Sequence, residues 1–123
     1  MNKKISIITP VFNGQDYIEQ VIESVLEQKY KNIEYIIVDG GSTDNTREII
    51  EKYRDKISKI IYQNDNSMYE AIDTGFKNAS GEYFYWINSD DFFLDDFSVY
   101  RLMETLNRKE YNWINCKIAI SKL

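Results

Sequence analysis

The chain has 123 residues, of which 43% are hydrophobic and 28% are charged, and this balance predicts one compact globular domain. Its net charge of -5 and the lack of a long basic run exclude nucleic acid as the expected main partner. The sequence has no histidine and a single cysteine, Cys116, so Ser-His and Cys-His triads, imidazole metal sites and an internal disulfide are excluded. Any metal held by this chain alone is therefore expected to have oxygen ligands, as Mg²⁺, Mn²⁺ and Ca²⁺ do.

Strand-like and helix-like patterns alternate along the chain. Short β-branched or aromatic runs predict strands, and apolar residues recurring at helical spacing predict helices. In chain order these are a strand at 5–10, a helix at 18–26, a strand at 33–39, a helix at 45–53, a strand at 57–63, a helix at 67–78, a strand at 82–88, a helix at 97–107 and a strand at 111–120. Asn45 and Glu48 fit a capping box for the second helix. The alternation predicts an α/β fold with a parallel sheet and helices on both of its faces.

Polar, turn-forming residues follow three of these strands: TPVFNG, DGGSTD and NSDD. Because the carboxyl ends of parallel strands meet at one edge of a sheet, we expect these segments to form one site. Asp39 is the last residue of its strand. A carboxylate there accepts hydrogen bonds from a nucleobase or ribose, or it serves as an ordinary turn residue. The sequence leaves both interpretations open.

The segment WINSDD, residues 86–91, runs from an apolar strand into two adjacent carboxylates. The four consecutive rings at 83–86 predict a central strand with core packing on both faces, rather than a sugar-stacking platform. Asp90 and Asp91 form either a solvated turn or part of a cation site, because adjacent carboxylates repel unless a cation or hydrogen-bond donors offset them. Asp95 and Asp96 are expected to start the next helix, where negative charge is favourable.

Two segments together resemble a known family: ISIITPVFNGQDYIEQVIESVLEQKYKNIEYIIVDGGSTDNT and, further on, ASGEYFYWINSDD. They are similar to the N-terminal part of the family 2 inverting glycosyltransferases, and the resemblance covers about residues 4–96. It implies a GT-A fold, that is, a Rossmann-like, mainly parallel sheet with helices on both faces, here truncated after the donor-binding half. Residues 1–123 are then expected to form a single nucleotide-sugar-binding domain.

The resemblance also implies a donor site for a nucleotide-diphosphate sugar, with UDP the expected nucleotide. The residues expected to contact the nucleotide are Thr9, Pro10, Val11, Phe12, Asp39, Ser42, Asp65 and Asp90. Among these, Asp39 would bind the base, Asp65 the base or ribose, and Asp90 the ribose or a bridging water, while Ser42 and Asp44 would support the loop. Asp91 would ligate the Mn²⁺ or Mg²⁺ that bridges the diphosphate.

The implied reaction is metal-dependent transfer of the sugar, with inversion, to a glycan or lipid-linked acceptor. The chain lacks a stretch long enough for a signal peptide or a membrane span, so the expected location is the cytoplasm, including a peripheral position at the membrane. The expected partner besides the donor is a second copy of the chain, through apolar surface left exposed.

The sequence departs from the family pattern in ways that keep a second reading open. No carboxylate after Asp96 matches the expected catalytic base, and Ser67 and Asp73 stand where glycine and asparagine are typical. The alternative is therefore a non-catalytic nucleotide-sugar-binding module. A nucleotidyltransferase is a weaker alternative, because the glycine-rich and basic phosphate loop it needs after the first strand is missing.

Overall fold

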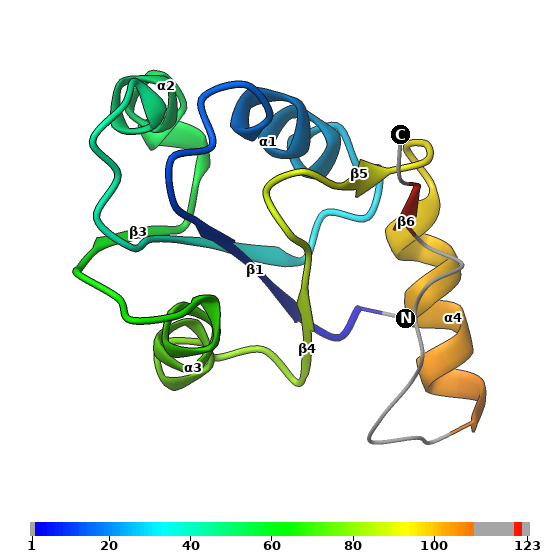
Figure 1. The fold of residues 1–123 in the computed structure, drawn as a ribbon. Coiled ribbons are helices and arrows are strands. Elements are labelled where there is room, and N and C mark those ends of the chain that lie inside the picture. Colours follow the sequence, from blue (N-terminus) through cyan, green and yellow to red (C-terminus); the bar gives the residue numbers. More distant parts are fainter. Residues whose placement is uncertain (1, 110–119, 122–123) are drawn as a thin grey trace.

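A computed structural model describes residues 2–109 and 120–121 (Figure 1). Four parallel strands form the main sheet in the order β3-β2-β1-β4. They are β1 (Ile5–Val11), β2 (Ile33–Asp39), β3 (Lys59–Tyr62) and β4 (Tyr83–Trp86). The helices are α1 (Ile18–Leu26), α2 (Thr46–Lys52), α3 (Met68–Lys77) and α4 (Ser98–Lys109), with a 3₁₀ turn, η1 (Arg54–Lys56). A separate antiparallel pair joins β5 (Phe92–Phe93) to β6 (Ile120–Ser121).

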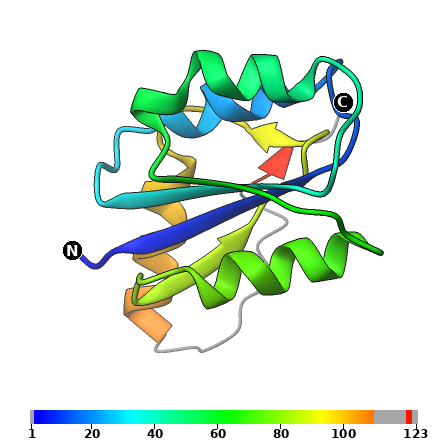
Figure 2. The same cartoon turned by 90° about the vertical axis from the view of Figure 1, so that its left-hand side faces the viewer.

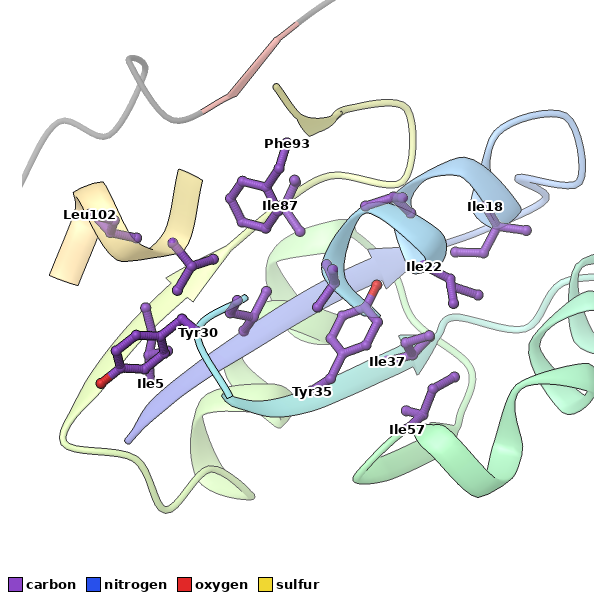
Figure 3. Packing of buried hydrophobic residues seen from close by; sticks show 14 of the residues in the cluster. Ile5, Ile18, Ile22, Tyr30, Tyr35, Ile37, Ile57, Ile87, Phe93 and Leu102 are labelled. Atoms are coloured by element: carbon purple, nitrogen blue, oxygen red, sulfur yellow. The ribbon is translucent and has the colours of Figure 1, made fainter. Parts of the chain in front are cut away.

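Helices cover both faces of the sheet, which confirms the predicted α/β architecture. In Figures 1 and 2, α1 and α2 lie on one face and α3 lies on the other. The larger apolar cluster lies on the α1 face and includes side chains from β1, β2, α1 and α4, such as Ile5, Tyr35, Ile22 and Leu102 (Figure 3). Every residue of β1 is buried, because the strand has a neighbour on each side and helices over both faces.

The opposite face depends on close contact between α3 and the sheet. Ile8, Ile36, Val38 and Ala71 form a second, smaller cluster there. A side chain at Gly75 would place its Cβ 2.5 Å from a methyl group of Ile8, so only glycine allows α3 to approach this closely.

The position of β4 corrects one prediction. Within the described residues β4 is an edge strand, with Phe84 49% and Trp86 38% exposed, while Tyr83 and Tyr85 pack partly buried against the main cluster. The prediction of a central strand with rings buried on both faces is therefore wrong. The physical reason is that α3 packs chiefly over β1 and β2, so the α3-side face of β4 is covered only in part, by Phe76 against Phe84.

Two further predictions had different outcomes. Residues 111–119 of the predicted last strand lie outside the described residues, and Ile120 pairs antiparallel with β5, separate from the main sheet. The prediction of a capping box at α2 is wrong, because the Asn45 side chain makes no capping hydrogen bond. Asp44 accepts the first-turn hydrogen bond instead, from the Thr46 N–H at 2.9 Å.

In the part of the chain that the structure describes, no helix is long and apolar enough to cross a membrane.

A buried carboxylate joins four segments around the amino-terminal half of β2. Glu34, 8% exposed, accepts hydrogen bonds from the Ser6 hydroxyl at 2.7 Å, the Ser80 N–H at 2.8 Å and the Ser80 hydroxyl at 3.0 Å. Lys59 Nζ lies 3.5 Å from the same carboxylate. Burial alone would raise the pKa of Glu34, but these donors outweigh it and lower the pKa to about 2.

We expect Glu34 to stabilise the fold in a pH-dependent way. Because its pKa is lower in the folded chain than in the unfolded chain, its contribution is present above about pH 4.5 and is lost as the pH falls toward about 2. Glu34→Gln should cost about 2–3 kcal/mol of unfolding free energy at pH 7 and much less at pH 2.5. Urea unfolding at both pH values measures this, with Glu27→Gln, an exposed carboxylate, as the control. An equal cost at both pH values would contradict the assignment.

Candidate functional site

A cavity of about 530 Å³ opens at the carboxyl edge of the sheet. Its walls are residues 10–14 at the end of β1 and just beyond it, residues 65–68 leading into α3, and residues 88–90 after β4, together with Tyr17, Gly40 and Ala71. The parallel register explains why these segments meet: Val11 pairs with Asp39, and Ile8 pairs with Trp86, so the loops that follow the strands begin at one edge. The three strand-end segments thus lie at one edge of the sheet, as predicted, and Gly40 is the residue of DGGSTD that lines the cavity.

The residues predicted to bind the nucleotide, together with the predicted metal ligand Asp91, divide into two groups. Those that line the cavity are Pro10, Val11, Phe12, Asp65 and Asp90. Those that lie buried outside its walls are Thr9, Asp39, Ser42 and Asp91. The Thr9 hydroxyl is hydrogen-bonded to the Tyr35 hydroxyl at 2.9 Å within the core.

Asp39 is a fully buried carboxylate at the end of β2. Its Oδ1 accepts hydrogen bonds from the N–H groups of Gly41 and Ser42, each at 2.8 Å. The Nε atom of Arg47 lies 3.6 Å from Oδ1, and the Arg47 guanidinium lies over the Tyr62 ring, 4.7 Å from its centre. Oδ2 accepts no hydrogen bond from any of the residues described. A buried anion with one satisfied and one spare oxygen is suited to accept a hydrogen bond from a ligand N–H.

Asn13 joins the loop after β1 to the loop after β2. Its backbone has a φ of 51°, in the left-handed region that asparagine tolerates better than most residues. Its Oδ1 accepts hydrogen bonds from the N–H groups of Thr43 at 2.8 Å and Asp44 at 3.4 Å, and its own N–H donates to Ser42 Oγ at 2.8 Å. Ser42 was expected to support the loop after β2, and its hydroxyl joins that loop to Asn13 by accepting this last hydrogen bond. Asn13 was not among the residues predicted from the sequence, although an Asn-Gly pair is a signal for a left-handed turn residue.

Asp44 adds a second set of bonds between the same loops. Its carboxylate accepts hydrogen bonds from the Thr46 N–H and hydroxyl and from the Gln15 N–H at 3.2 Å. Desolvation would raise the pKa of Asp44, but these hydrogen bonds lower it below the usual value. Gly14 N–H donates to Thr46 Oγ1 at 2.8 Å, which completes the junction. The floor of the cavity is thus held by bonds between two loops that the sequence separates by about thirty residues.

Asp90 and Asp91 lie in different environments although they are adjacent. Asp90 is exposed and lines the cavity, whereas Asp91 is only 4% exposed and its N–H donates to the Asn88 carbonyl at 3.1 Å. Asn88 and Ser89 line the same wall, and Asn88 Oδ1 is buried and accepts no hydrogen bond from the described residues. This wall is therefore lined by an amide, a hydroxyl and a carboxylate side chain.

Such an all-oxygen set suits Mg²⁺ or Mn²⁺ better than a softer metal. Within residues 2–109 and 120–121, no group of three or more acidic, histidine or cysteine side chains is placed to hold a metal by itself. The residues therefore fit a hard cation that takes its remaining ligands from water and a bound phosphate.

Comparison with known families decides what this site belongs to. The model of Glycosyl transferase family 2 matches residues 6–122, which is nearly the whole chain. The chain belongs to glycosyl transferase family 2. Among curated relatives, a glycosyltransferase of Rickettsia typhi is 45% identical over 89 residues, and the Streptococcus pneumoniae glycosyltransferase GlyA is 35% identical over 111 residues. These alignments cover 72% and 89% of this chain but only 28% and 15% of the relatives.

Solved structures show the same fold. S. aureus TarS 1-349 in complex with UDP-GlcNAc has a TM-score of 0.79 and 27% identity, covering 87% of this chain and 32% of that chain. The Pyrobaculum calidifontis mannosyltransferase PcManGT, solved with GDP-Man and Mn²⁺, has a TM-score of 0.80 and 19% identity, covering 86% of this chain and 33% of that chain. The expected GT-A fold is thereby confirmed, and this family 2 chain spans about a third of each solved structure.

We expect Asn13 to stabilise the floor of the site both by its hydrogen bonds and by its tolerance of a positive φ. Asn13→Gly keeps the backbone conformation and removes the side-chain bonds, so it should cost about 1–2 kcal/mol of unfolding free energy. Asn13→Ala should cost about 1 kcal/mol more, because alanine is strained at this φ. Urea unfolding of the two variants separates the two contributions. Equal stability of the glycine and alanine variants would contradict the role given to φ.

Proposed function

We propose that residues 1–123 are the donor-binding half of a glycosyltransferase that binds a UDP-linked sugar together with Mn²⁺ or Mg²⁺. The supporting observation is the cavity at the carboxyl edge of the sheet, whose walls carry Asp65 and Asp90 and behind which Asp39 is buried. Membership of family 2 gives the class of reaction, and the UDP-GlcNAc complex of TarS supports the nucleotide. The chain spans 28% of the Rickettsia relative and 32% of TarS 1-349. We therefore propose, rather than infer from the relatives, that it takes part in sugar transfer.

In this proposal each wall of the cavity receives one part of the donor. The base lies against residues 10–12, and we assign a base N–H to Asp39 Oδ2, which is buried outside the walls next to Gly40. The ribose lies near Asp65, and the diphosphate reaches the wall that carries Asp90. We assign the cation to Asp91 together with the phosphate oxygens, and we assign Asp90 to the ribose or to a bridging water. The cation would stabilise the negative charge of the departing nucleoside diphosphate.

The proposed reaction is displacement at the anomeric carbon with inversion, toward a glycan or lipid-linked acceptor. It needs a carboxylate base to remove the acceptor proton. Asp95 is not suited to this role: the Phe97 N–H and Arg101 lower its pKa, and the same contacts fix it at the start of α4. The alternative function is therefore a non-catalytic module that binds the same donor. We place the protein in the cytoplasm, at the membrane surface where the acceptor is lipid-linked.

The first test is nucleotide binding by calorimetry with UDP, in the presence of Mn²⁺ or EDTA. We expect metal-dependent binding that Asp39→Asn weakens about 10- to 100-fold, because the amide would set an N–H against the base N–H. Asp91→Asn should weaken binding with Mn²⁺ and leave the weak binding in EDTA nearly unchanged. Asp55→Asn, an exposed carboxylate on η1, serves as the matched control. Absence of metal-dependent UDP binding by the wild-type chain would overturn the proposal.

The same protein distinguishes the two functions through turnover. The chain is incubated with UDP-sugars, and the UDP released is measured. We expect at most slow hydrolysis, because no catalytic base has been identified among the described carboxylates. Rapid transfer to an added acceptor would show that the chain is a complete catalyst and would exclude the module.

We further propose that the chain self-associates through the edge of β4. The strand carries no charged residue in Tyr83–Trp86 and exposes Phe84 and Trp86, and among the described residues no strand pairs with its outer edge. Sedimentation velocity should show a concentration-dependent dimer that Phe84→Thr with Trp86→Thr reduces. Leu94→Thr, 55% exposed elsewhere, is the control. A monomer at all concentrations would contradict this proposal.

A further inference from the structure

Asp65 is held in place by Gly40, at the end of β2, and by Gln63, two positions before it. Its N–H donates to the Gly40 carbonyl at 3.1 Å, which continues the alignment of the β3 end with the β2 end. Its side chain lies flat against Gly40, where an added Cβ would come within 2.6 Å of Asp65 Oδ2. The Gln63 side-chain amide donates to Asp65 Oδ1. Glycine on one side and an amide on the other thus restrict the direction of the carboxylate.

Gln63 is in turn held by α3. The Thr74 hydroxyl lies 3.0 Å from Gln63 Nε2 and 3.1 Å from Gln63 Oε1. Because a carboxylate only accepts hydrogen bonds, the Gln63 nitrogen must face Asp65, and its oxygen is then left to accept from the Thr74 hydroxyl. The backbone N–H of Gln63 donates to the Asp39 carbonyl at 2.9 Å, which fixes Gln63 to the end of β2.

Neither Gln63 nor Thr74 lines the cavity, whereas Asp65 and Gly40 do. Any effect of the two outer residues on a ligand must therefore pass through Asp65. Among the described residues, the one side chain that donates to Asp65 is the neutral amide of Gln63. Its second oxygen, which lies beside Gly40, accepts no hydrogen bond from the described residues and can accept one from a ligand at the cavity wall.

We propose that Gln63 and Thr74 are positioning residues that orient Asp65 to accept hydrogen bonds from the ribose hydroxyls of a bound nucleotide. The inference rests on the proposed function, because it assumes a nucleotide in the cavity. It goes further because it assigns a preference for nucleotides with ribose hydroxyls to Gln63 and Thr74, two residues that do not line the cavity. A fixed carboxylate binds a pair of neighbouring hydroxyls better than a mobile one, since less side-chain freedom is lost on binding.

The test compares the affinities for UDP and for 2′,3′-dideoxy-UDP, by calorimetry with Mn²⁺. In the wild type we expect UDP to bind about tenfold more tightly, as for hydrogen bonds to a charged group. Gln63→Leu should weaken UDP binding by a similar factor and leave the dideoxy nucleotide nearly unchanged. Asp65→Asn should do the same, and the double variant should lose little more than either single variant, because both act on one contact.

A matched pair at Thr74 guards against a merely structural effect. Thr74→Val removes the hydroxyl at nearly constant volume and should reduce the preference for UDP about threefold, whereas Thr74→Ser keeps the hydroxyl and should retain the preference. If Gln63→Leu fails to fold, this pair decides the question alone. Equal weakening of both nucleotides, or no weakening of either, would overturn the inference. Failure of the wild type to bind any UDP would instead overturn the proposed function, so the two failures are distinguishable.

Discussion

The parallel pairing of β1 with β2 on one side and β4 on the other is the constraint on which the site depends. Seven residue pairs join β1 to β2 and four join β1 to β4, and all of β1 is buried. This pairing register aligns the carboxyl end of each strand with the ends of its neighbours. Three loops that are far apart in sequence therefore start at the same edge, and the cavity lies among them. A shift of one residue in either pairing would move the loops and turn the buried face of the strand outward.

The site places its carboxylates at different depths, and each depth is matched by different donors. Asp39 has no solvent exposure and relies on two backbone N–H groups and the nearby Arg47 guanidinium. Asp65 is partly exposed and is held by an amide, while Asp90 is exposed at the cavity wall. Among these three carboxylates the most buried one has the most donors, because burial makes an unpaired anion costly. The same burial makes the spare oxygen of Asp39 a stronger acceptor for a ligand than an exposed carboxylate would be.

Sequence patterns were sufficient for the elements with strong periodicity and for the shared edge. The strand ending at Asp39 and the helix between Ser67 and Asn78 were predicted nearly to the residue. The interpretation of β4 as a central strand was wrong, because an apolar run does not reveal whether its neighbours lie on one side or on both. The roles of Asn13 and Gln63 could not be predicted either, since their partners are about thirty and eleven positions away and come close only in the folded chain. Polar side chains of this kind carry no periodic signal.

The adjacent pair Asp90 and Asp91 illustrates how local geometry changes an electrostatic argument. From the sequence, their mutual repulsion was a reason to expect a cation between them. In the structure, the turn closed by the hydrogen bond from Asp91 to the Asn88 carbonyl places one carboxylate at the cavity and the other inside the protein. Repulsion alone therefore no longer requires a metal. A cation is favoured instead by the oxygen-rich wall that the turn forms, because that wall would otherwise face the negative charge of a diphosphate unaided.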